Sequence, residues 1–185
     1  MKLIKILILI FLSTTVSNKT YSNEQLKQSL KQEGKLIFIR HAYAPGSGDP
    51  NNFTLYDCST QRNLNQIGIK QSKNIGLFFL KNKIKIDKVL SSQWCRCKDT
   101  AFYAFKDYEE KSFLNSFYDK KFAHFKSKQI IELKKYIQKW NGKKNLVLIT
   151  HYVVISEILN LSVSSAEIVI TDKNFNFLGR YEIKK

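Results

Sequence analysis

Two apolar stretches of the chain decide its fold: Lys35-Leu-Ile-Phe-Ile39, followed by Arg40-His41, and Asn145-Leu-Val-Leu-Ile149, followed by Thr150-His151. Each is a short run rich in apolar and β-branched residues, which is typical of a buried strand. Each ends in a histidine. Because ligands of open α/β sheets bind beyond the carboxyl ends of the strands, we expect the two imidazoles to face one crevice if the strands are neighbours.

The rest of the chain predicts further helices and strands. Helices are expected over residues 23–32, over 66–81 with Asn65 as the cap, over 94–105, over 126–140, and from the second histidine to residue 159. Strands are expected at 87–90, near 112–115, and as a closing hairpin at 167–171 and 176–183. Because strands alternate with helices, the sequence predicts an α/β fold with a mostly parallel sheet.

The first 22 residues have a pattern of their own. Lys2 and Lys5 precede an apolar run over residues 6–12, and small polar residues follow. This order is typical of a secretory signal peptide, and the run is too short to cross a bilayer, which takes about 20 apolar residues. We therefore expect residues 1–22 to be a signal peptide and residues 23–185 to be a single domain. The mature protein would be exported, periplasmic or secreted, and would keep no stable membrane span. An uncleaved anchor or a buried strand is the alternative.

The cysteines are compatible with export, because an oxidising compartment allows a disulfide to persist. The chain has three of them: Cys58, Cys95 and Cys97. The last two are too close in sequence for a usual disulfide, and the set is too sparse for a zinc site. We expect Cys58 to pair with Cys95 or Cys97, leaving one free thiol; the alternative is three reduced cysteines.

The basic residues are nearly all lysines. The chain has 31 basic and 15 acidic side chains and a net charge of +16, yet only four arginines: Arg40, Arg62, Arg96 and Arg180. Arginine presents a planar fork that grips phosphate through two hydrogen bonds, which lysine cannot reproduce. The lysines are spread along the whole chain instead of gathering with aromatic residues on one element, so no nucleic-acid partner is expected.

Four of these side chains are expected to converge on one anion. Arg40 accompanies His41, and Arg96 follows a strand at the start of a helix, where free N–H groups favour anions. Together with His151 they provide two imidazoles and two guanidiniums, which suit a phosphate. A neutral imidazole can attack phosphorus and hold it as phosphohistidine. This chemistry needs no metal and no other cofactor, and none is expected.

Four segments resemble, in order and spacing, the motifs of the histidine phosphatase superfamily, also called phosphoglycerate mutase-like. Residues 36–42 resemble its Arg-His-Gly signature, 63–72 the opening of its first helix, 89–101 its Ser-Ser-Pro-x-x-Arg-x-x-x-Thr-Ala segment, and 146–151 its Thr-His-Gly segment. Three residues depart from these motifs: Ala42 and Tyr152 stand in place of glycines, and Gln93 in place of proline. Of these, Tyr152 is expected to narrow the pocket or to touch the substrate.

The resemblance implies a three-layer α/β/α sandwich and a metal-independent phosphomonoester hydrolase. His41 would be the nucleophile that becomes phosphorylated. Arg40, Arg96 and His151 would bind the phosphoryl oxygens, and Arg62 would join them from the loop. The substrate would be a small phosphorylated molecule, such as a sugar phosphate or an envelope component, and the basic composition favours a polyanionic one.

The resemblance also implies a carboxyl group that protonates the leaving oxygen. Asp119 is the candidate, because it lies between the motifs at 89–101 and 146–151, at a place similar to that of the acid in lipopolysaccharide core heptose phosphate phosphatases. Glu109 and Glu110 are rivals, and Glu157 is a weaker one. A phosphomutase and a non-catalytic phospholigand-binding protein on the same fold are the alternative functions. The third histidine, His124, has no motif around it, and the oligomeric state is left open.

Overall fold

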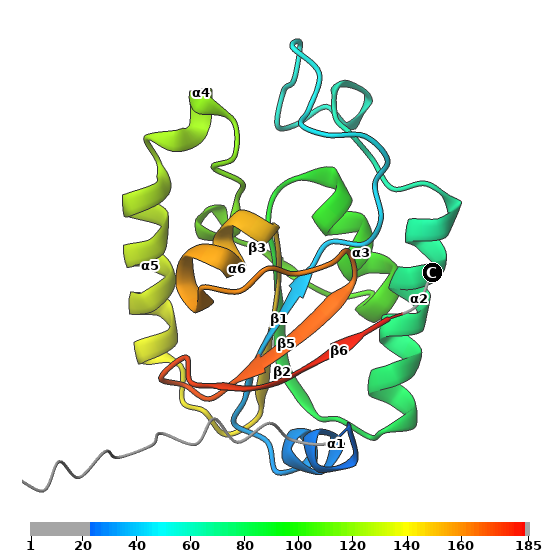
Figure 1. Ribbon diagram of the computed structural model, residues 1–185, viewed down its shortest axis with the longest axis vertical. Coiled ribbons are helices and arrows are strands. Elements are labelled where there is room, and N and C mark those ends of the chain that lie inside the picture. The colour runs from blue at the N-terminus through cyan, green and yellow to red at the C-terminus, as the bar shows by residue number, and fades with distance from the viewer. Residues whose placement is uncertain (1–22, 184–185) are drawn as a thin grey trace, which may run out of the picture.

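The computed structural model describes residues 23–183, and its centre is a six-stranded mixed sheet (Figure 1). In chain order the strands are β1 (Leu36–Arg40), β2 (Ile86–Ser91), β3 (Glu109–Glu110), β4 (Asn145–Thr150), β5 (Glu167–Thr171) and β6 (Phe177–Glu182). They are arranged in the order β3-β2-β4-β1-β5-β6. The α/β fold that the sequence predicts is confirmed.

The sheet is parallel only in part. The strands from β3 to β1 pair in parallel, whereas β5 pairs antiparallel with β1, and β6 with β5. The backbone of Ala166 donates a hydrogen bond to the carbonyl of Arg40, so β5 starts at the carboxyl end of β1 and must run back along it. A hairpin turn then joins β5 to β6 and makes their pairing antiparallel as well.

The helices α1 (Asn23–Lys31), α2 (Gln66–Lys81), α3 (Cys95–Phe105), α5 (Lys126–Lys139) and α6 (Tyr152–Leu159) follow the predicted segments closely. The short helix α4 (Lys120–Ala123) and the 3-10 turns η1 (Cys58–Thr60) and η2 (Ser112–Leu114) were not predicted. The strand predicted near 112–115 is wrong, because this segment forms η2. Phe113 and Leu114 are neighbours in sequence and are buried in the same core, whereas a strand would point them to opposite faces.

Apolar cores cover both faces of the sheet. Ile37 and Ile39 point into one core with α1, α2 and α3, while Leu36 and Phe38 point into the other with α5 and α6. The side chains of β4 alternate in the same way. Because both faces of these two strands are buried, their sequences are continuous apolar runs instead of alternating ones.

The first turn of α2 packs directly on the chain that leaves β1. Asn65 caps the helix, since its Oδ1 accepts a hydrogen bond from the backbone N–H of Gly68 at 3.1 Å. A Cβ atom on Gly68 would lie 2.1 Å from the carbonyl oxygen of Tyr43. Glycine at this position therefore allows the close approach that fixes the chain just after His41.

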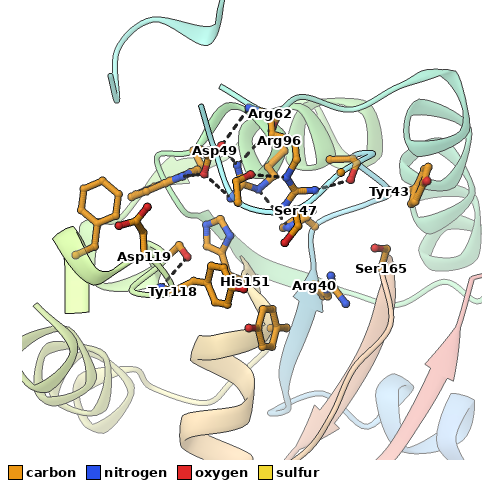
Figure 2. Close-up of a pocket in the computed structure, with 18 residues that line it drawn as sticks. Arg40, Tyr43, Ser47, Asp49, Arg62, Arg96, Tyr118, Asp119, His151 and Ser165 are labelled. Atoms are coloured by element: carbon orange, nitrogen blue, oxygen red, sulfur yellow. Dashed lines mark hydrogen bonds and ion pairs between the residues drawn. The ribbon is translucent and has the colours of Figure 1, made fainter. Parts of the chain in front are cut away.

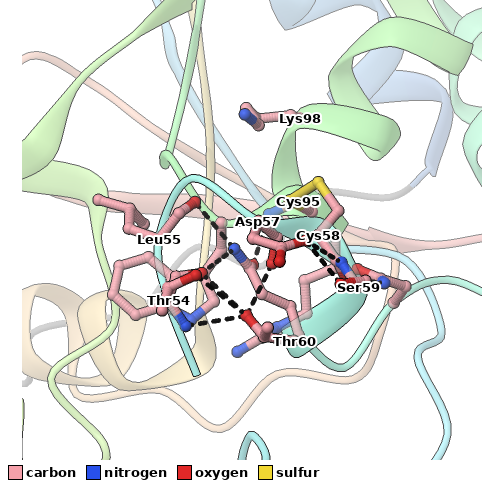
Figure 3. The surroundings of a disulfide bond; sticks show 12 residues. Thr54, Leu55, Asp57, Cys58, Ser59, Thr60, Cys95 and Lys98 are labelled. Carbon is pink, nitrogen blue, oxygen red and sulfur yellow. Dashed lines mark hydrogen bonds between the residues drawn. A yellow bond between two sulfur atoms is a disulfide. The ribbon is translucent and has the colours of Figure 1, made fainter. Parts of the chain in front are cut away.

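A long loop between β1 and α2 rises beyond the carboxyl ends of the strands (Figure 1). The Cys58–Cys95 disulfide joins η1 in this loop to the first residue of α3 (Figure 3). Gln61 strengthens the connection, because it donates to the carbonyls of Thr54 and Leu55 and accepts from the backbone N–H of Cys95. The expected disulfide is thus present, and Cys97 is the buried free thiol.

The segment expected to be a signal peptide, residues 1–22, lies outside the described residues. Among residues 23–183, no helix is long and apolar enough to cross a membrane.

Candidate active site

His41 and His151 lie side by side at the carboxyl edge of the sheet. Strands β1 and β4 are parallel neighbours with Arg40 opposite Thr150, so the histidine that follows each strand emerges at the same level. The two rings have centroids 5.4 Å apart, and both side chains are buried. The backbone N–H of His41 also donates to the carbonyl of Thr150 at 2.9 Å. The crevice predicted between the two imidazoles is therefore present.

A hydrogen bond to the backbone sets the tautomer of His41. Its Nδ1 lies 2.8 Å from the carbonyl oxygen of Ala42, which can only accept, so Nδ1 carries the proton. The Nε2 atom then keeps its lone pair. It accepts a hydrogen bond from the Nε–H of Arg96, with the two nitrogen atoms 3.3 Å apart. A neutral His41 thus presents its unprotonated nitrogen toward the arginine cluster.

Both imidazoles are held in the uncharged form. Burial lowers the pKa of His41 well below its usual value of 6.5, and the positive charges of Arg96, Arg40 and Arg62 lower it further. Burial and Arg96 likewise lower the pKa of His151. The site therefore keeps a ring nitrogen of His41 unprotonated at neutral pH.

Arg96 is held by a carboxylate that sequence analysis did not find. Asp49 accepts two hydrogen bonds from its guanidinium, at 2.7 and 3.1 Å, and also binds the backbone N–H of Arg62 and the indole N–H of Trp94 (Figure 2). Burial raises the pKa of Asp49, but the bonds and charge of Arg96 outweigh it, so the net pKa is lowered. Asp49 is therefore an ionised carboxylate that orients the arginine.

Two further arginines complete the positive charge of the site. Arg62 donates through Nε to the carbonyl of Gly48 at 2.8 Å and through Nη1 to the carbonyl of Ala44. Arg40 donates through Nη1 to the carbonyl of Val163 at 2.7 Å. The Nε–H of Arg40 is buried and has no hydrogen-bond partner among residues 23–183. An anion bound here would satisfy this donor.

His151 rests on two side chains of the third motif. Its Nε2 lies 3.0 Å from the hydroxyl of Ser92 and 3.5 Å from the sulfur of Cys97. Ser92 is fixed in turn by Asn115, whose Oδ1 lies 3.1 Å away. Burial raises the pKa of the Cys97 thiol to about 12, so this sulfur packs against the ring as an uncharged group.

A cavity of about 230 Å³ opens above the two histidines. Its lining includes every site residue that the sequence predicts: Arg40, His41, Arg62, Arg96, Asp119 and His151. Figure 2 shows Tyr118 and Asp119 on one side of His151 and Arg40 on the other. A second cavity, of about 320 Å³ and mostly apolar, shares the wall formed by Trp94, Ser116 and Phe122.

The structure separates the four carboxyl candidates for the general acid. Asp119 lines the cavity and caps α4 through Oδ1, which accepts from the backbone N–H of Lys121. Glu109 pairs with Lys88 and Lys111, and Glu110 with Lys98; Glu157, on α6, pairs with Lys126. Of the four candidates, only Asp119 lies in the wall of the histidine cavity.

The part of the chain from 23 to 183 contains no group of three or more His, Cys, Asp or Glu side chains placed to hold a metal ion.

Several residues of the site were not predicted from the sequence. They are Asp49 and the aromatic lining from Tyr43, Trp94, Tyr118 and Phe122. Asp49 lies in a loop between motifs, where no spacing rule marks it.

Comparison with known proteins identifies the fold. No family model and no curated protein matches the sequence. Among solved structures, the protein histidine phosphatase SixA in complex with tungstate matches with a TM-score of 0.56 and 16% identity, over 79% of this chain and 95% of that one. The α-ribazole phosphatase from Shigella flexneri matches with a TM-score of 0.57 and 14% identity, over 78% and 94%.

A third match is the phosphoserine phosphatase from Entamoeba histolytica, solved in complex with phosphoserine, with a TM-score of 0.52 and 17% identity over 74% of this chain and 89% of that one. The fold shared with these phosphatases is consistent with the resemblance in motif order and spacing found in the sequence. The chain therefore has the fold of the histidine phosphatase superfamily.

Proposed function

We propose that this protein is a phosphatase that hydrolyses small phosphomonoesters through a phosphohistidine at His41. One observation carries the proposal: a buried, neutral imidazole presents Nε2 to a cavity that is also lined by Arg40, Arg62 and Arg96. Phosphoryl transfer needs an in-line nucleophile and fixed positive charge around the equatorial oxygens, and this cavity supplies both. The matched structures of phosphatases support the same class of reaction.

The geometry suggests the course of the reaction. The Nε2 lone pair of His41 forms a bond to phosphorus while the bond to the ester oxygen breaks, and that oxygen takes a proton from Asp119. The carbonyl of Ala42, at 2.8 Å from Nδ1–H, stabilises the positive charge that develops on the ring. Water then attacks the phosphohistidine and gives its proton to Asp119. Inorganic phosphate leaves, and His41 and the protonated acid are regenerated.

Asp119 suits the role of acid better than the other carboxyl group in the cavity. Asp49 is ionised and holds two hydrogen bonds to Arg96, so it has no proton to give. Asp119 uses only Oδ1 for capping, which leaves Oδ2 available to a leaving oxygen. Arg40, Arg62, Arg96 and His151 would then hold the phosphoryl oxygens, and we propose that the reaction requires no metal ion.

The direct test is hydrolysis of 4-nitrophenyl phosphate by the purified protein, with and without EDTA. Turnover should survive EDTA and fall at least about 1,000-fold in His41→Ala. His124→Ala is the matched control, because His124 is exposed outside the cavity and its loss should leave the rate unchanged. Loss of activity in EDTA would contradict the metal-free reaction. Tungstate binding without any turnover would instead indicate a phospholigand-binding protein.

The acid can be tested through the leaving group. In Asp119→Asn, kcat/KM for an alkyl phosphate should fall about 100-fold or more, because an alkoxide needs a proton to leave. The kcat/KM for 4-nitrophenyl phosphate, which reports on phosphoryl transfer to His41 and not on the later hydrolysis of the phosphohistidine, should fall much less, since nitrophenolate leaves unprotonated. Glu110→Gln removes a carboxyl group outside the cavity and provides the control. Equal losses on both substrates would overturn the role of Asp119.

We further propose that the protein acts after export, in the periplasm or outside the cell. The pattern of residues 1–22 supports this, and so does the Cys58–Cys95 disulfide, which persists in oxidising compartments. The intact mass of the protein recovered from fractionated cells tests it. A mass that still includes the first 22 residues, in a cytoplasmic fraction, would contradict it.

A further inference from the structure

Two exposed tyrosines form one side of the mouth of the cavity. Tyr118 is 55% exposed and precedes α4, and Tyr152 is 39% exposed and begins α6. Both line the histidine cavity, with ring centroids 5.8 Å apart and planes inclined by 60°. Aromatic rings this exposed at the mouth of a site offer a surface for a ligand that is itself apolar or aromatic.

The tyrosines lie next to the residues that would bind the phosphoryl group. The guanidinium carbon of Arg40 lies 5.4 Å from the centroid of the Tyr152 ring. The Nε–H of the same arginine, which also lines the cavity, is buried and has no hydrogen-bond partner among residues 23–183. A phosphoryl group held by Arg40 therefore brings its ester substituent close to Tyr152.

The charges of the cavity do not favour a second anionic group on the substrate. Among the described residues, its basic lining consists of Arg40, Arg62 and Arg96, without any lysine. Arg96 already donates two hydrogen bonds to Asp49, and Arg62 donates two to backbone carbonyls. The remaining donors suit one phosphoryl group. The expectation of a polyanionic ester, which came from the overall composition, finds no support in this lining.

We propose that Tyr118 and Tyr152 bind the leaving group, and that the preferred substrates are monoesters whose leaving group carries one aromatic ring. This inference rests on the proposed phosphatase function and adds the substrate class to it. The cavity, at about 230 Å³, is smaller than most ligand sites, which span about 300–1,000 Å³. Its size therefore suits a single ring better than a lipid or an oligosaccharide.

The test compares two leaving groups of similar size and chemistry. Benzyl and cyclohexylmethyl phosphate both release a primary alcohol, but only the first has a flat ring. Wild-type kcat/KM should favour benzyl phosphate about 10-fold, as one aromatic contact allows. Tyr118→Ala/Tyr152→Ala should reduce this ratio to about 1, and the double Phe variant should retain the ratio. Tyr56→Ala, at a ring 89% exposed outside the cavity, is the control.

A binding measurement keeps the inference testable without turnover. Calorimetry should show that benzylphosphonate binds about 10-fold more tightly than cyclohexylmethylphosphonate, and that the double Ala variant loses this difference. Equal affinities, or a difference that survives in the variant, would overturn the role of the tyrosines. Tighter binding of propane-1,3-bisphosphonate than of benzylphosphonate would show that charge, not the ring, selects the substrate. If no ester is hydrolysed but the aromatic preference persists, the phosphatase function fails and the subsite stands.

Discussion

His41 and His151 are buried beside three arginines, and this setting makes their charge state the property on which the chemistry depends. Their pKa values in the folded protein lie well below 6.5, first because of burial and then because of Arg96. In the unfolded chain both would return to about 6.5. Below this pH the unfolded state binds more protons than the folded one, so folding stability is fully present above pH 6.5 and decreases as the pH falls.

This difference predicts a pH dependence of unfolding that can be assigned to one residue. As the pH falls below 6.5, each histidine that stays neutral in the folded state should lower the free energy of unfolding, with a slope that approaches about 1.4 kcal/mol per pH unit. His41→Gln cannot titrate, so its free energy of unfolding in urea should fall less steeply by about that slope. His124→Gln, at an exposed position, should follow the wild type. Parallel curves for wild type and His41→Gln would show that the imidazole is not held neutral.

Individual residues of the site could be predicted where a motif marks them. His41 and His151 follow buried strands, and Arg40 and Arg96 stand out among many lysines, so four side chains were found from the sequence. Asp49 was not, because its role depends on a loop that brings it to Arg96, 47 positions away in sequence. The expected polyanionic substrate likewise came from total charge, which does not reveal where the charge lies.

The loop between β1 and α2 shows how an irregular element positions the site. It carries Asp49 and Arg62, and two links fasten it to the start of α3: the Cys58–Cys95 disulfide and the Asp49–Arg96 ion pair. The side chains of this ion pair are only 11% and 4% exposed, respectively. A nearly buried pair depends on both of its members, because removing one leaves the other charge without compensation.

Asp49→Asn should therefore destabilise the protein by about 3 kcal/mol and lower kcat/KM for 4-nitrophenyl phosphate as Arg96 loses its orientation. Urea unfolding and steady-state kinetics measure the two effects. Glu157→Gln breaks a pair with Lys126 that is largely exposed, and it should change stability by less than about 1 kcal/mol. If Asp49→Asn reduced stability and kcat/KM no more than Glu157→Gln does, Asp49 would not be a positioning residue.

Regular elements were predictable because their apolar patterns are local. The strands β1 and β4 and the helices α2 and α5 agree with their predicted ranges to within a residue or so. The failure at η2 has a non-local cause, since Phe113 and Leu114 both turn toward the core against α5. The direction of β5 was also hidden from the sequence, because it follows from where the chain re-enters the sheet.

At the scale of the whole molecule, the sheet brings distant segments to one edge. Residues that are 110 positions apart, His41 and His151, become neighbours through the parallel pairing of β1 and β4. The loop carrying Asp49 and the segment carrying Asp119 close over the same edge. This assembly supports the central claim that the fold places one nucleophilic imidazole, one acid and a set of guanidiniums around a single phosphoryl group.

The most direct test of this claim is to trap the phosphorylated protein. Asp119→Asn should still accept a phosphoryl group from 4-nitrophenyl phosphate but hydrolyse it slowly, so the intermediate should accumulate. After an alkaline quench, which preserves phosphohistidine, intact mass spectrometry should show one added phosphoryl group, and peptide mapping should place it on His41. The same experiment with His41→Ala/Asp119→Asn should show none. A phosphoryl group on any other residue, or continued turnover by a protein that lacks His41, would contradict the account.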